Sequence, residues 1–157
     1  MTVTGFGGAG LVGRNLVRRL AADGKVIRVA VRDIEAANYL RPMGDVGQIV
    51  PIAADLGDNK SVAAAVEGAD SVVNMFGLVY DGGNPYFEHL HKLGATNVAK
   101  ASADAGVLNL VQLSAIGASR RSFPAYDRQQ RAGEMIVKKA YTLCPVLRPR
   151  SNFGPEA

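Results

Sequence analysis

"GFGGAGLVG", residues 5–13, lies between a short apolar run and a segment with helical spacing. Its glycines Gly7, Gly10 and Gly13 recur at every third position. A tight turn requires a residue that tolerates positive φ, and a pyrophosphate approaches closely only where the backbone carries no side chains. The N-terminus of the following helix adds free N–H groups and the positive end of its dipole. The stretch therefore predicts the phosphate-binding turn of a βαβ unit, with a merely tight turn as the alternative.

The rest of the chain alternates between strand and helix patterns. We expect one domain over residues 1–157: an α/β fold with a doubly wound parallel sheet in three α/β/α layers, of the Rossmann type. Right-handed crossovers give the strand order 3-2-1-4-5-6 and a ligand site between strands one and four. The expected strands are 2–6, 26–32, 49–53, 71–76, 107–113 and 142–148, the last an edge strand because of Pro145. The expected helices are 11–22, 34–40, 59–66, 85–106 and 124–140, with 41–48 as a loop.

The bulk composition narrows the class of protein. A chain of 157 residues that is 48% hydrophobic is long enough for one packed core. No apolar run reaches the ~20 residues of a membrane span, and no secretory leader is visible. The net charge of +4 suits phosphate ligands or an acidic partner, but no nucleic-acid or metal-binding motif accompanies it. Cys144 has no second cysteine to pair with, so we expect a buried thiol in a reducing compartment.

The end of the second strand is where a dinucleotide's adenosine ribose is recognised. Asp33 lies twenty positions after Gly13 and suits a ribose hydroxyl, or alternatively an N-cap of the next helix. Arg32 suits a 2′-phosphate, and Arg14 is placed to contribute, which favours NADP(H) with NAD(H) as the alternative.

Further cofactor contacts are expected from the turn and from the ends of the third and fourth strands. Asp55 is a candidate for the adenine edge or a plain turn residue, and Asn74 for the dinucleotide path or for backbone groups nearby. The complete predicted cofactor set is Gly7, Gly8, Gly10, Leu11, Val12, Gly13, Arg14, Arg32, Asp33, Asp55, Leu56, Asn74, Gly77 and Gln130.

Several motifs together resemble those of the atypical and extended short-chain dehydrogenase/reductases, over almost the whole chain. They are "GGAGLVG" (7–13), "AADL" (53–56), "VVNMFG" (72–77), "VQLSAIGA" (111–118) and "LRPRSNFGP" (147–155). "LRPMGDVGQIV" (40–50), "SAIGA" and "RAGE" resemble one branch, which holds the NADPH-containing accessory subunit of respiratory complex I and its bacterial relatives. A glycine turn without its own function is the alternative for "RPMGDVGQ".

Active members of that superfamily share their chemistry among a Ser or Thr, a Tyr and a Lys. Here Tyr126 matches the tyrosine and Gln130 occupies the lysine position, with ordinary helix-surface residues as the alternative. Ser114 is the nearest serine, although the reactive position falls near Ile116, and its alternative is a structural hydroxyl at a strand end. A tyrosine with an ordinary pKa of about 10 needs a nearby positive charge to act near neutrality, and glutamine supplies none. Glutamine can still hydrogen-bond a ribose, so the change harms catalysis more than cofactor binding.

The resemblance leaves three functions open. The first is an NADPH-binding structural or assembly protein at complex I with little or no turnover, in the mitochondrial matrix or the cytoplasm and peripheral to a membrane. The second is an active NAD(P)-dependent reductase, epimerase or dehydratase, and the third is an NADP-sensing regulator. Relatives continue into a C-terminal substrate lobe that we expect to be absent from this chain, which ends at Ala157.

Overall fold

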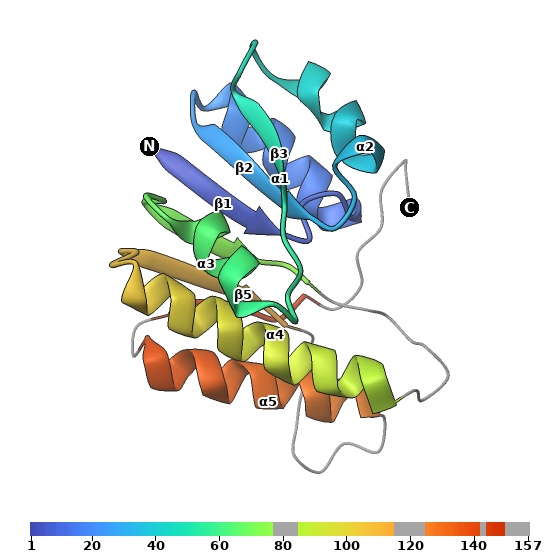
Figure 1. Cartoon of the computed structure of the whole chain (residues 1–157), viewed down its shortest axis with the longest axis vertical. Helices are drawn as coiled ribbons and strands as arrows, with labels where there is room; N and C mark the ends of the chain where they lie inside the picture. The colour runs from blue at the N-terminus through green and yellow to red at the C-terminus, as the bar shows by residue number, and fades with distance from the viewer. Residues whose placement is uncertain (77–84, 115–124, 142–143, 150–157) are drawn as a thin grey trace.

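The predicted sheet is confirmed in a computed structural model, which describes residues 1–76, 85–114, 125–141 and 144–149, with the side chains of 85–92 and 125–132 excluded. Within that part, the strands form one parallel sheet in the order β3-β2-β1-β4-β5-β6 (Figure 1). The strands are β1 Thr2–Phe6, β2 Val26–Val31, β3 Ile49–Ala53, β4 Ser71–Asn74, β5 Asn109–Leu113 and β6 Val146–Leu147. The helices are α1 Leu11–Ala22, α2 Ile34–Ala37, η1 Asn38–Met43 (a 3₁₀ helix), α3 Asn59–Val66, α4 Pro85–Asp104 and α5 Ala125–Ala140.

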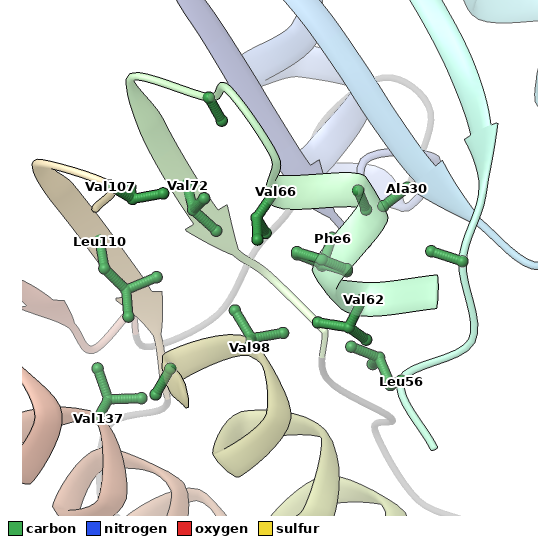
Figure 2. Close-up of a cluster of buried hydrophobic side chains, with 14 of the residues drawn as sticks. Phe6, Ala30, Leu56, Val62, Val66, Val72, Val98, Val107, Leu110 and Val137 are labelled. Carbon is green, nitrogen blue, oxygen red and sulfur yellow. The ribbon is translucent and has the colours of Figure 1, made fainter. Parts of the chain in front are cut away.

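One face of the sheet is covered by α3, α4 and α5, and the apolar cluster beneath them is continuous (Figure 2). Phe6 of β1, Val72 of β4 and Leu110 of β5 point into it from the sheet. The helices contribute fully buried valines, which are Val62, Val66, Val98 and Val137. Burying each such side chain stabilises the fold by about 1.5–3 kcal/mol.

The opposite face is covered by α1, α2 and η1, which completes the three-layer arrangement. Val17 and Ala21 of α1 pack with Ile27 and Val29 of β2, and Leu40 of η1 is fully buried beside them. β2 packs on both of its faces, because Ile27 and Val29 belong to this cluster and Ala30 belongs to the cluster beneath α3, α4 and α5. A largely apolar run of this kind is typical of a parallel strand that is covered on both sides.

Some element boundaries differ from the prediction. The expected strand 107–113 begins at Asn109, because the Val107 N–H closes the end of α4 by donating to the Ser102 carbonyl, with Gly106 at φ +68°. The expected strand 142–148 is confirmed only over Val146–Leu147, with residues 142–143 outside the described part. Residues 41–43, expected in a loop, extend the 3₁₀ helix η1.

Pro51 lies inside β3, and the register explains why the strand accepts it. The Gln48 carbonyl accepts from the Ile27 N–H at 2.8 Å, and the Ala54 N–H donates to the Val31 carbonyl at 2.9 Å. Alternate residues of a parallel strand bond to opposite neighbours, so the Pro51 nitrogen points to the outer side of this edge strand. The proline removes one donor from an edge that another chain would otherwise pair with.

Candidate functional site

The glycine-rich turn leaves β1 and enters α1 beside the end of β4. Gly7 adopts φ +77°, and a Cβ there would meet the Met75 carbonyl carbon at 2.9 Å and the Phe76 nitrogen at 3.0 Å. A Cβ on Gly13 would overlap the Gly7 carbonyl oxygen and the Gly8 backbone. The turn, the helix and the neighbouring strand therefore pack at distances that only glycine permits.

The N-terminus of α1 is left without a protein cap. Gly10 is extended, and among the described residues no side chain caps this end and no acidic residue lies in the first turn. The Gly10 N–H donates to the Gly7 carbonyl at 3.1 Å. The N–H groups of Leu11 and Val12 have no acceptor within the helix, because the first turn of any α-helix lacks one. These groups suit an anionic ligand.

A pocket opens directly beside this turn, at the carboxyl ends of β1, β2 and β3. Its volume of about 160 Å³ is below the roughly 300–1,000 Å³ of sites that enclose a whole ligand. It therefore suits one end of a dinucleotide. The lining residues are Phe6, Gly7, Ala9, Gly10, Ala30, Val31, Arg32, Ala54, Asp55, Leu56 and Phe76.

Of the residues predicted for the adenosine end after β2 and at the start of α1, only Arg32 lines this pocket, and Asp33 and Arg14 are not among its lining residues. Arg32 lines the pocket and is exposed. Asp33 N-caps α2, because its Oδ1 accepts from the Ala36 N–H at 3.1 Å, so the N-cap alternative is present in the structure. Arg14 is half-buried on α1.

Asp55 and Leu56 follow β3 and are both fixed by neighbours. Asp55 Oδ1 accepts from the Gly57 N–H at 2.8 Å, which is a turn contact, while the residue also lines the pocket. The Leu56 carbonyl accepts from Asn97 Nδ2 on α4 at 2.7 Å. The loop after β3 therefore forms part of the pocket wall and is hydrogen-bonded to α4.

Asn74 ends β4 with its side chain paired inside the protein. Its Nδ2 donates to Gln112 Oε1 on the adjacent strand at 3.0 Å, and its Oδ1 accepts from the Phe76 N–H at 3.2 Å. The second contact is the backbone role that the sequence left open. Gly77 lies outside the described residues.

The predicted catalytic residues are located only in part. Ser114 follows β5 and is 4% exposed, its N–H donates to the Leu147 carbonyl at 2.7 Å, and its Oγ has no hydrogen-bond partner within the described residues. Tyr126 and Gln130 lie one turn apart at the start of α5, as expected, but their side chains are outside the described part.

Sequence reasoning missed several residues of the pocket. Ala9, Ala30, Ala54 and Phe76 line it without any polar side chain to draw attention to them. Their position in the sequence was the only available signal, since each lies within a strand that ends at the site or no more than three residues after one. Tyr39 on η1 was also missed; its hydroxyl donates to the Ala9 carbonyl at 2.7 Å.

Cys144 is buried, as expected. Its thiol donates to the Leu110 carbonyl at 2.7 Å. Burial raises the pKa of this thiol above its ordinary value, and burial likewise raises the pKa of Tyr141. A neutral buried thiol of this kind is unreactive.

Two features of the described residues fit a bound dinucleotide. The turn has a cradle that a Cβ would fill, and Ser114 presents an unpaired buried hydroxyl among the described side chains. The family described as NAD(P)H-binding matches the chain over residues 7–143. The chain belongs to this family. As an NAD(P)H-binding domain, it takes a nicotinamide dinucleotide.

Relatives of this NAD(P)H-binding domain include subunits of a respiratory enzyme. The mitochondrial NADH-ubiquinone oxidoreductase 40 kDa subunit of Neurospora crassa is 32% identical over 99% of this chain and 41% of that protein. The mitochondrial NADH dehydrogenase [ubiquinone] 1 alpha subcomplex subunit 9 of Arabidopsis thaliana is 33% identical over 99% of this chain and 39% of that protein. A ceramide reductase of Caulobacter vibrioides is 30% identical over 95% of this chain and 45% of that protein. The chain spans less than half the length of these relatives, and they confirm the resemblance seen in the motifs.

Solved structures confirm the fold of the domain. A Bacillus halodurans protein assigned as an NAD-dependent epimerase/dehydratase matches with a TM-score of 0.83 at 23% identity, over 98% of this chain and 73% of that one. The triphenylmethane reductase of a Citrobacter species matches with a TM-score of 0.74 at 24% identity, over 94% of this chain and 48% of that one. Within the described residues of this chain, no helix is both long and apolar enough to cross a membrane.

Proposed function

We propose that this chain binds NADP(H) and serves as a structural or assembly component of respiratory complex I, with little or no turnover. The observation that carries the binding half is the packing of Gly13 on the turn. It brings the uncapped N–H groups of Leu11 and Val12 beside Gly10, which lines the pocket at the carboxyl ends of β1, β2 and β3. A pyrophosphate on these groups gains both hydrogen bonds and the helix dipole.

The preference for NADP(H) rests on Arg32. Its guanidinium is exposed at the rim of the pocket, directly after β2, where the adenosine ribose is expected. One carboxylate oxygen of Asp33 already accepts a hydrogen bond from the N-terminus of α2. Asp33 is therefore less suited to bind the ribose hydroxyls of NAD(H). A bidentate guanidinium–phosphate pair is stronger than a hydrogen bond between neutral groups.

The proposed role at complex I is supported by the names of the relatives and by Gln130. Proteins named as NADH-ubiquinone oxidoreductase subunits match 99% of the chain. A glutamine in place of the family's lysine removes the positive charge that a catalytic Tyr126 requires. A bound dinucleotide then stabilises the fold by mass action, and we expect a location on the matrix or cytoplasmic side of the complex.

The second candidate is an NAD(P)-dependent reductase, epimerase or dehydratase. The ceramide reductase relative favours it, as does the unpaired hydroxyl of Ser114 within the described part of the chain. A regulator that responds to the NADP/NADPH ratio would use the same pocket, and it differs from the first proposal in releasing its cofactor readily.

One preparation tests all three. The longest natural form is purified, its retention of NADPH through gel filtration is measured, and NADPH oxidation is followed over a panel of carbonyl compounds. Retention without oxidation supports the structural role, and Gln130→Lys provides a matched variant with the family's charge restored. Oxidation by the unmodified protein that is abolished in Tyr126→Phe contradicts it in favour of the enzyme, and rapid release of NADPH favours the regulator.

A further inference from the structure

Tyr39 contacts the phosphate-binding turn from thirty residues away. Its hydroxyl donates to the carbonyl oxygen of Ala9 at 2.7 Å, although Tyr39 itself is exposed. Ala9 precedes Gly10, which is the N-cap of α1. The contact therefore reaches the peptide unit immediately before the free N–H groups of the helix.

This peptide unit is held at both of its polar ends. Tyr39 binds the Ala9 carbonyl, and the Gly10 N–H donates to the Gly7 carbonyl at 3.1 Å. A peptide unit is planar, so fixing its oxygen and its nitrogen sets the orientation of the whole plane. An unfixed Ala9 carbonyl could rotate toward the ligand and repel a phosphate. With it held, the next N–H groups in the chain, those of Leu11 and Val12, are left for the anion.

Tyr39 is itself held in place by buried neighbours. Leu40, the next residue of η1, is 0% exposed, and Ala37 at the end of α2 is 1% exposed. Asp33 caps α2 through the Ala36 N–H. The position of the hydroxyl is thus set by packing rather than by the exposed ring alone.

The "RPMGDVGQ" segment contacts the other end of α1. Gln48 Nε2 donates to the carbonyl of Ala21 near the end of α1 at 2.7 Å, and Gln48 Oε1 accepts from the Asp45 N–H at 2.8 Å. Residues 38–48, which we call the α1 clamp, therefore bind the end of α1 through Gln48 and the turn before its start through Tyr39. This gives the segment a role in place of the bare glycine turn that was the alternative.

We propose that Tyr39 is a positioning residue for pyrophosphate binding, acting through the Ala9 carbonyl and held by the α1 clamp. The proposal rests on the dinucleotide binding proposed above. It specifies that Tyr39 aligns the turn and does not touch the adenosine, because Tyr39 is not among the residues that line the adenosine pocket.

The test compares two tyrosine variants and two ligands by calorimetric or NMR titration. Tyr39→Phe is expected to weaken NADPH binding about fivefold, the fold-change that one net hydrogen bond gives. It should leave the affinity for adenosine, which has no phosphate, within about twofold. Tyr141→Phe is the matched control, because it removes a tyrosine hydroxyl that donates to the Val107 carbonyl at 3.1 Å, at the opposite ends of the strands. Both affinities should be unchanged in that control.

The outcomes of this titration distinguish a positioning role of Tyr39 from a general structural one. Selective loss of NADPH affinity in Tyr39→Phe supports the proposal. Unchanged NADPH affinity overturns it, and so does an equal loss for NADPH and adenosine, since that would indicate a general loosening of the site. If the unmodified protein binds no dinucleotide, the proposed function is overturned together with this inference, whereas the other two failures leave dinucleotide binding intact.

Discussion

Arg148, directly after β6, forms a two-pronged ion pair with Glu134 of α5. Arg148 Nε donates to Glu134 Oε1 at 2.7 Å and Arg148 Nη2 to Oε2 at 2.5 Å. The Glu134 side chain is 0% exposed, whereas that of Arg148 is 41% exposed. This pair joins the sheet edge to the helix that carries Tyr126 and Gln130, and its hydrogen bonds to Glu134 raise the pKa of the Arg148 guanidinium.

Arg148→Ala is expected to destabilise the protein strongly, because it removes the guanidinium that donates two hydrogen bonds to a fully buried carboxylate. Lys100→Ala is the control, since it breaks an exposed ion pair with Asp104 whose side chains are 75% and 65% exposed. The shift of the urea midpoint should be several times larger for Arg148→Ala. Equal shifts would show that the buried pair contributes no more than a surface one.

Gly13→Ala should weaken NADPH binding about tenfold or more, a loss of about 1.4 kcal/mol or greater, because its Cβ would push α1 away from the turn. Gly24→Ala is the matched control. Gly24 has a positive φ of +72°, and in the described structure nothing lies within 4 Å of its Cβ position. That variant should lose about 1 kcal/mol of stability and keep its affinity for NADPH. Titration and thermal melts separate the two effects, and a Gly13→Ala protein with full affinity would contradict the close packing.

Arg32→Ala should lower the affinity for NADPH about tenfold, or about 1.4 kcal/mol, and leave that for NADH nearly unchanged. The reason is that only NADPH carries the 2′-phosphate that the exposed guanidinium is proposed to bind. Arg18→Ala on the outer face of α1, where Arg18 bonds Asn15, is the control. If Arg32→Ala weakens both dinucleotides equally, the specificity assignment is wrong.

Much of the fold followed from patterns that depend on neighbours in sequence. Gly7, Gly13 and the run Val26–Val31 predicted the first βαβ unit correctly, because turn chemistry and burial on both faces leave local signals. Contacts between distant segments left no such signal. The contact of Tyr39 with Ala9 depends on how η1 packs, and no sequence pattern predicts it.

The same limit applied to the pocket and to the sheet edges. Apolar lining residues such as Ala54 differ from ordinary core residues only in where the fold places them. Pro145 indicated an edge strand, and β6 is at an edge, but Pro51 indicated the opposite edge and was not used. A proline inside an apolar run predicts an edge only once the register shows where its nitrogen points.

Stability should fall at alkaline pH because the folded protein raises the pKa of the Cys144 thiol and the Tyr141 hydroxyl. Each group stays neutral longer in the folded state, so its contribution is intact below its ordinary pKa of 9.0 for the thiol and 10.0 for the phenol. It is lost as the pH rises through that value toward the folded one, by at most about 1.4 kcal/mol per pH unit for each group. Urea midpoints measured from neutral pH upward check this. Cys144→Ala should flatten the first part of the decline, and an unchanged decline in that variant would refute the role of the thiol.

The central claim is that the dinucleotide binds with its pyrophosphate on the start of α1 and its adenosine in the adjoining pocket. A crystal structure of the purified protein incubated with NADPH tests it most directly. We predict phosphate oxygens within hydrogen-bond distance of the Leu11 and Val12 N–H groups, and the adenosine 2′-phosphate beside Arg32. A structure in which NADPH is absent from this turn under saturating conditions, or occupies another part of the molecule, would contradict the account.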